Sequence, residues 1–118
     1  TDSHTVLAAG GINAAFGNLD PEDSWQQHFV DTYLEGYGIG DPMQIEIMAK
    51  ESPTLVEEID KWGANFAKLK NGNLDQRFFG AHKYRRTCYH IIPIYYNSHT
   101  IWVQIIRLQY ALSYSHSL

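Results

Sequence analysis

The sequence predicts an α+β fold with two or three helices and one β-hairpin. Aspartate followed by proline, at Asp20-Pro21 and Asp41-Pro42, marks two helix starts, and apolar residues at three- and four-residue spacing follow each of them. Farther along, Asn71-Gly72 stands between two apolar stretches and is typical of a tight hairpin turn. These signals place the helices first and the hairpin after them.

The first helix is expected over about residues 21 to 36. Asp20 would be its N-cap and Pro21 its first helical residue, because a proline there sacrifices no helical hydrogen bond. A glycine-rich stretch would then close the helix at Gly36 or Gly38.

The second helix repeats this start at Asp41-Pro42 and would end at Gly63. Pro53 interrupts it, because an interior proline removes a hydrogen bond and clashes with the preceding turn. The segment is therefore expected to be one bent helix, or two helices of which the second has Ser52 as its N-cap.

The hairpin is expected to pair residues 66–69 with 74–78 around the Asn71-Gly72 turn, because both turn residues tolerate φ > 0. Residues 91–118 differ in kind from the rest, since Arg107 is their only charged residue. Residues 91–96 and 100–112 could pair with each other, but so apolar a tail is equally prone to aggregate.

Composition limits the functional classes. A chain of 118 residues, 19% charged and 44% hydrophobic, is ordinary for one soluble globular domain, and its net charge of −4 argues against a nucleic-acid partner. Cys88 is the only cysteine, which excludes an internal disulfide and fits a reducing compartment. We expect neither a transmembrane helix nor a signal peptide, because there is no run of about 18 apolar residues and no basic leader.

The first dozen residues carry the strongest functional signal. Ser3-His4-Thr5 is followed by small residues and by Gly10-Gly11, with residues 5–9 expected as a short strand or extended segment. A neutral imidazole is a good nucleophile near neutral pH, and glycine lets the backbone approach a flat ring or a phosphate closely. A tight turn after an apolar strand is the plainer interpretation of such a glycine pair.

This segment resembles the flavin-attachment segment of succinate dehydrogenase and fumarate reductase flavoprotein subunits. The likeness continues through 10–15, 20–25, 75–80 and 84–89 in the same order, so it covers residues 1 to 90. The related L-aspartate oxidases carry a non-histidine residue where His4 stands. One departure is Ala9, where the family often has glutamine.

The resemblance implies a fragment of a larger α/β FAD-binding domain. Residues 1–18 would be the flavin-binding segment, 19–90 the helix-hairpin part, and 91–118 an apolar tail unlike the family, for which we hypothesise a shifted reading frame or a rearranged gene. The dinucleotide-binding strand and the catalytic arginine would lie outside the chain, so no catalytic residue is assigned. We expect the chain alone to be inactive in succinate oxidation.

The resemblance also implies the ligands and the partners. FAD would be held covalently through His4, with the cofactor contacted by Ser3, His4, Thr5, Ala9, Gly10 and Gly11. Phe79 would contact the dicarboxylate, although a core aromatic at the end of the hairpin is the alternative. Electrons would pass to an iron-sulfur subunit, and the protein would be cytoplasmic or held peripherally on the inner face of the cell membrane through partner subunits.

The remaining polar clusters predict less. Lys83, Arg85 and Arg86 are expected to form a solvated face or a contact with a partner subunit. The six histidines lack metal-ligand spacing, so no metal site is predicted. Two alternatives stay open besides the flavoprotein: an interaction module without cofactor that uses the aromatic tail as its partner surface, and a truncated, frame-shifted gene product that folds only in part.

Overall fold

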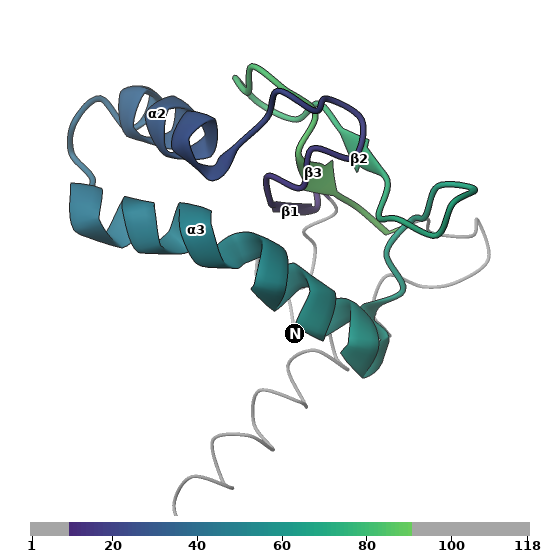
Figure 1. The fold of residues 1–118 in the computed structure, drawn as a ribbon. Coiled ribbons are helices and arrows are strands. Elements are labelled where there is room, and N and C mark those ends of the chain that lie inside the picture. Colours follow the sequence, from purple (N-terminus) through teal and green to yellow (C-terminus); the bar gives the residue numbers. More distant parts are fainter. Residues whose placement is uncertain (1–9, 91–118) are drawn as a thin grey trace, which may run out of the picture. The chain divides into compact units, whose positions relative to one another are not determined.

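The computed structural model describes residues 10–90, which form one unit of the chain. The elements follow in the order β1 (Ile12–Asn13), α2 (Trp25–Glu35), α3 (Pro42–Ile59), the π-helical turn η1 (Asp60–Ala64), β2 (Gln76–Arg77) and β3 (Thr87–Cys88) (Figure 1). The predicted α+β class is confirmed. The extended segment expected at 5–9 and the pairing expected in the tail lie outside the described residues. Among the residues described, no helix is both long and apolar enough to cross a membrane.

Helix α2 begins later than predicted, and Asp20 is not its N-cap. Ser24 takes that role, because its hydroxyl oxygen accepts a hydrogen bond from the backbone N–H of Gln27 at 3.2 Å. The Asp20 carboxylate instead accepts from the backbone N–H of Arg85 at 2.7 Å. A partner from far along the chain has therefore displaced the local cap.

The connection between the helices follows the sequence prediction. Gly36 ends α2, and its N–H donates to the carbonyl oxygen of Thr32 at 3.0 Å. Asp41 caps α3 by accepting from the backbone N–H of Met43 at 2.9 Å, with Pro42 as the first helical residue. Both ends depend on residues within a few positions of each other.

Pro53 does not break α3, which runs as one helix from Pro42 to Ile59. Proline has no N–H for the carbonyl oxygen of Ala49, four residues earlier. The hydroxyl group of the buried Ser52 donates to that same oxygen at 3.3 Å. Ser52 thus compensates for the missing donor inside the helix rather than capping a new one.

The hairpin turn forms where the sequence predicts it. Lys68 bridges Leu74, and the N–H of Leu69 donates to the carbonyl oxygen of Asn73 at 2.8 Å. Gly72 takes φ = +89°, whereas Asn71 is not among the residues with positive φ. The arms pair with each other only briefly, because both then turn to the segment that contains β3.

Strand β3 is the centre of a three-stranded antiparallel sheet with the order β1-β3-β2. Ile12 and Gln76 both lie opposite Cys88, on the two sides of that strand. Strands β1 and β3 were not predicted, because strands of two residues are too short to show an alternating pattern. The sheet joins the glycine segment to residues near 76 and 88.

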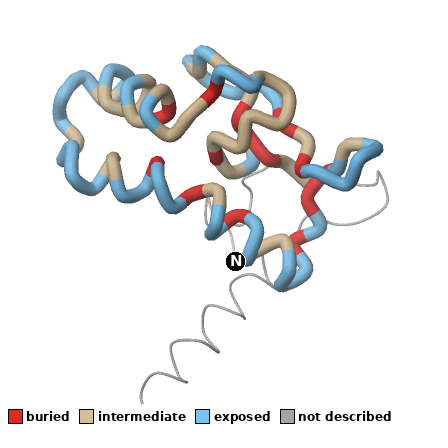
Figure 2. The backbone as a smooth tube through the Cα atoms, in the orientation of Figure 1, coloured by how far each residue is buried: buried red, intermediate tan, exposed pale blue. Residues whose placement is uncertain are grey.

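The core is built mainly from small apolar side chains. Figure 2 shows the buried residues along one side of α3 and in the strands that face it. The buried apolar residues are Ala14, Ala49, Val56, Ala64, Phe66, Ala67, Leu74 and Cys88. The side chain of Arg86 is also fully buried, so part of the interior is charged.

Candidate functional site

Three of the predicted binding residues fall in the described part of the chain: Gly10, Gly11 and Phe79. Ser3, His4, Thr5 and Ala9 lie outside the described residues. The structure places Phe79 against Gly10, although the two are far apart in sequence. The candidate site is therefore built around the glycine pair and the residues that contact it.

Gly11 lies directly on the central strand of the sheet. Its φ of +111° is a conformation that other residues rarely adopt. A Cβ atom on Gly11 would overlap the carbonyl oxygen of Cys88 and lie 2.8 Å from Cγ2 of Thr87. This position requires glycine both for its backbone angle and for its close contact with β3.

Gly10 is enclosed by the segment that follows β2. A Cβ atom on Gly10 would lie 2.9 Å from Cζ of Phe79, so the edge of the ring rests on the glycine. The Arg77 guanidinium donates from Nη2 to the Gly10 carbonyl oxygen at 2.8 Å. Phe79 is 55% exposed among the described residues.

Asn13 connects β1 to β3 and to the loop beyond Phe79. Its Oδ1 accepts a hydrogen bond from the hydroxyl group of Thr87 at 2.6 Å. The side-chain amide of Asn13 also forms a hydrogen bond with Nε2 of His82, with 2.9 Å between Nδ2 and Nε2. Burial, and then the positive charge of Arg86, lower the pKa of His82 and favour its neutral form.

These contacts border a pocket of about 430 Å³. Asn13 and His82 line one part of it, and Phe79 lines another. The remaining walls come from the loop at 80–81 and from helix α2 at Asp31, Thr32, Glu35 and Gly36. The pocket thus lies between the loop that carries Phe79 and the C-terminal half of α2.

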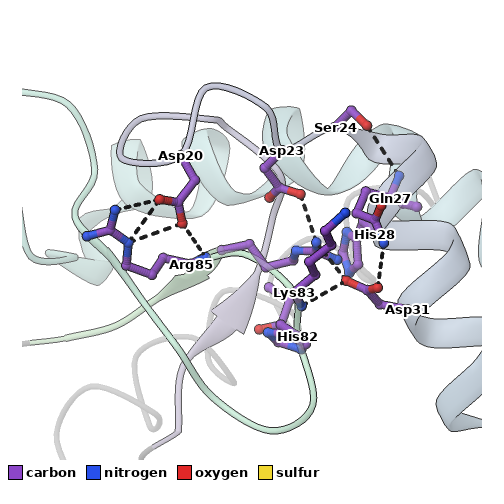
Figure 3. Close-up of polar contacts among 12 residues, drawn as sticks. Asp20, Asp23, Ser24, Gln27, His28, Asp31, His82, Lys83 and Arg85 are labelled. Carbon is purple, nitrogen blue, oxygen red and sulfur yellow. Dashed lines mark hydrogen bonds and ion pairs between the residues drawn. The ribbon is translucent and has the colours of Figure 1, made fainter.

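Arg86, at the end of this loop, forms a buried ion-pair cluster. Its Nη2 donates to Asp23 at 2.7 Å and to Asp31 at 2.8 Å, and no part of the Arg86 side chain is exposed. Arg85 pairs with Asp20 through its guanidinium group, as Figure 3 shows. The prediction of a solvated face is therefore wrong for Arg86, which is buried. Arg85 forms a specific ion pair with Asp20 that was not predicted.

His28 belongs to the same cluster and is 2% exposed. Burial, and then the nearby charge of Arg86, lower the pKa of His28 to about 4, so the imidazole is neutral at pH 7. Sequence reasoning missed this polar interior. In α2 the usual burial pattern is inverted, because His28 is buried while Val30 and Leu34 are 42% and 66% exposed.

Both glycines of the predicted flavin-binding segment are packed against other parts of the chain. A side chain on Gly10 would meet the ring of Phe79, and one on Gly11 would meet β3. These contacts within the chain explain why neither position carries a side chain.

Comparison with known families identifies FAD as the cofactor of the family. A family model described as "FAD binding domain" matches residues 1–108. The matched range contains all of the predicted cofactor and substrate residues.

Relatives and solved structures point to one group of proteins. The chain is 48% identical over 86 residues to a fumarate reductase (CoM/CoB) subunit of Methanothermobacter marburgensis, covering 73% of this chain and 16% of that protein. It is 44% identical over 80 residues to the mitochondrial succinate dehydrogenase flavoprotein subunit of Oryza sativa, covering 68% of this chain and 12% of that protein. The structure of Mycobacterium smegmatis Sdh1 in complex with UQ1 matches with a TM-score of 0.75 and 37% identity, over 92% of this chain and 17% of that one.

Proposed function

Because the chain belongs to the FAD binding domain family, we propose that it forms one wall of the flavin and substrate site in a flavoprotein that interconverts succinate and fumarate. FAD is the cofactor of the family. The contact between Gly10 and Phe79 carries the proposal, because it joins an expected flavin-binding residue to the expected substrate-binding one. In this proposal residues 1–18 are the flavin-binding segment and 19–90 the helix-hairpin part that supports it.

Each residue has a limited role in this proposal. FAD supplies the hydride chemistry when it is bound. His4 anchors the cofactor covalently, aided by Ser3 and Thr5, while Gly10 and Gly11 offer bare backbone to the ring. Phe79 packs against the dicarboxylate and excludes water from it.

The rest of the catalytic machinery lies in other parts of the protein, according to this proposal. The chain spans 12 to 17% of the length of the relatives and of the solved structure compared above. We propose that electrons pass to an iron-sulfur subunit, which also brings the protein to a membrane surface. The names of the relatives support this, since they are subunits of larger enzymes.

The activity is tested in the complete flavoprotein that contains this sequence, with its partner subunits. Succinate should reduce a dye acceptor and fumarate should reoxidise the reduced flavin. After acid precipitation the flavin should stay with the protein, whereas in the His4→Ala variant it should remain in the supernatant. If neither dicarboxylate changes the flavin spectrum, the proposed function is wrong.

The substrate role of Phe79 has a matched control in its neighbour. Phe78 and Phe79 are 58% and 55% exposed, but it is the Phe79 ring that lies against Gly10. Phe79→Ala should raise KM for succinate about tenfold, because an aromatic contact with the substrate is lost. Phe78→Ala should change KM by less than about twofold. Equal effects of the two substitutions would contradict the role of Phe79.

A further inference from the structure

The loop between β2 and β3, residues 78–86, has little apolar packing to hold it in place. Phe78 and Phe79 are more than half exposed. Gly80 has φ = +75°, and no atom lies within 4 Å of the position that a Cβ atom would occupy there. The placement of Phe79 therefore depends on polar contacts elsewhere in the loop.

One of these contacts is at the site itself. His82 lies three residues after Phe79, and its Nε2 forms a hydrogen bond with the Asn13 amide at 2.9 Å. Both residues line the pocket that Phe79 also borders. This hydrogen bond ties the middle of the loop to the strand that follows the glycine pair.

The other anchor is Asp31 of α2. Its Oδ2 accepts from the backbone N–H of Lys83 at 3.3 Å and from Arg86 at 2.8 Å, while Oδ1 accepts from the side-chain amide of Gln27 at 2.7 Å. Figure 3 shows the contacts of Asp31 with Gln27 and Lys83. One carboxylate, whose side chain is only 13% exposed, thus holds two points of the loop to the helix.

The negative charge of Asp31 matters as well as its shape. Arg86 is buried with no exposed side-chain area, so its positive charge must be compensated inside the protein. Asp23 and Asp31 provide that compensation at one nitrogen. Without the charge of Asp31, the end of the loop would lose a charge-assisted hydrogen bond and part of the compensation for the positive charge of Arg86.

We propose that Asp31 is a positioning residue that holds the 78–86 loop so that Phe79 lies against Gly10. This inference rests on the proposed function only in assigning a substrate role to Phe79. Asp31 itself contacts no part of the flavin or dicarboxylate in this proposal. It acts through Lys83 and Arg86 on the loop.

The chain contains a closely matched control. Asp60 also has a mostly buried side chain, 14% exposed, and accepts from the backbone N–H of Phe66 at 3.1 Å and from Lys68 at 2.8 Å. It lies at the end of α3, and it does not line the pocket beside Phe79. Asp31→Asn and Asp60→Asn therefore remove the same kind of contact at different places.

Hydrogen exchange in the complete flavoprotein tests the positioning without requiring turnover. In Asp31→Asn the amides of residues 79–84 should exchange about tenfold faster, the effect of losing a hydrogen bond to a charged group. In Asp60→Asn these amides should be unchanged. If Asp31→Asn does not fold, Gln27→Ala removes only the neutral donor and should accelerate the same amides by a smaller factor. Unchanged exchange at 79–84 in a folded variant would overturn the proposal.

Turnover tests whether the positioning acts through Phe79. Asp31→Asn should raise KM for succinate by about fivefold with kcat changed less than about twofold, because no reacting group is altered. In a Phe79→Ala background the same substitution should raise KM no further, since the positioned side chain is already absent. A full additional rise in that background would overturn the coupling. If the protein turns over neither dicarboxylate, the proposed function fails, while the exchange result still decides the role of Asp31.

Discussion

Replacing Gly11 with alanine should destabilise the fold through two separable effects. The first is backbone strain, because φ = +111° is unfavourable for a residue with a Cβ atom and costs about 1 to 3 kcal/mol. The second is steric, because that Cβ atom would overlap the Cys88 carbonyl oxygen and crowd Thr87. Overpacking of this kind costs about another 1 to 3 kcal/mol.

Gly63 separates the two effects. It has a similar φ of +102°, but no atom lies within 4 Å of the position of its Cβ atom. Gly63→Ala should therefore show the strain alone. Urea unfolding of the full chain, followed by tryptophan fluorescence, should give Gly11→Ala a free energy of unfolding about 1 to 3 kcal/mol lower than that of Gly63→Ala. Equal losses would refute the close contact between Gly11 and β3.

Three further predictions concern buried polar groups. The free energy of unfolding should fall by roughly 2 to 3 kcal/mol as pH drops from about 6.5 to 4, because His28 binds a proton more readily in the unfolded chain than in the folded one. His28→Gln should flatten this pH dependence, and an unchanged slope in that variant would contradict the prediction. Burial, and then the charges of Asp60 and Asp75, raise the pKa of the Cys88 thiol to about 12. A thiol reagent at pH 8 should therefore react slowly with Cys88 until urea unfolds the chain, and fast reaction with the folded protein would contradict this prediction. Arg86→Met should lower the free energy of unfolding in urea by about 3 to 5 kcal/mol, because it leaves the carboxylates of Asp23 and Asp31 without their cation. A loss below about 1 kcal/mol would show that the cluster is open to water.

Features that depend on neighbours in the chain were predictable. The start of α3 at Asp41-Pro42, the end of α2 at Gly36 and the turn at Asn71-Gly72 all form hydrogen bonds within four residues. Such contacts form wherever the local sequence occurs, so capping and turn chemistry alone locate them. The glycine pair and the family resemblance likewise identify the cofactor from the sequence alone.

Features that depend on distant partners were not predictable from local patterns. Asp20 has the sequence of an N-cap, yet its carboxylate accepts from Arg85. Arg86 has the sequence of a surface residue, yet two carboxylates from α2 and the turn before it allow its burial. A charge enters a protein interior only when its counter-charge is brought there by the fold.

The candidate site shows the same division. Sequence patterns and the family resemblance predict a flavin-binding segment at residues 1–18 and a substrate contact at Phe79. The tertiary structure is needed to see that the Phe79 ring contacts Gly10, that Gly11 packs against β3, and that Asp31 binds the loop between β2 and β3. The physical reason is that β3 pairs with segments from both ends of the described chain, so residues far apart in sequence become neighbours only when that sheet forms.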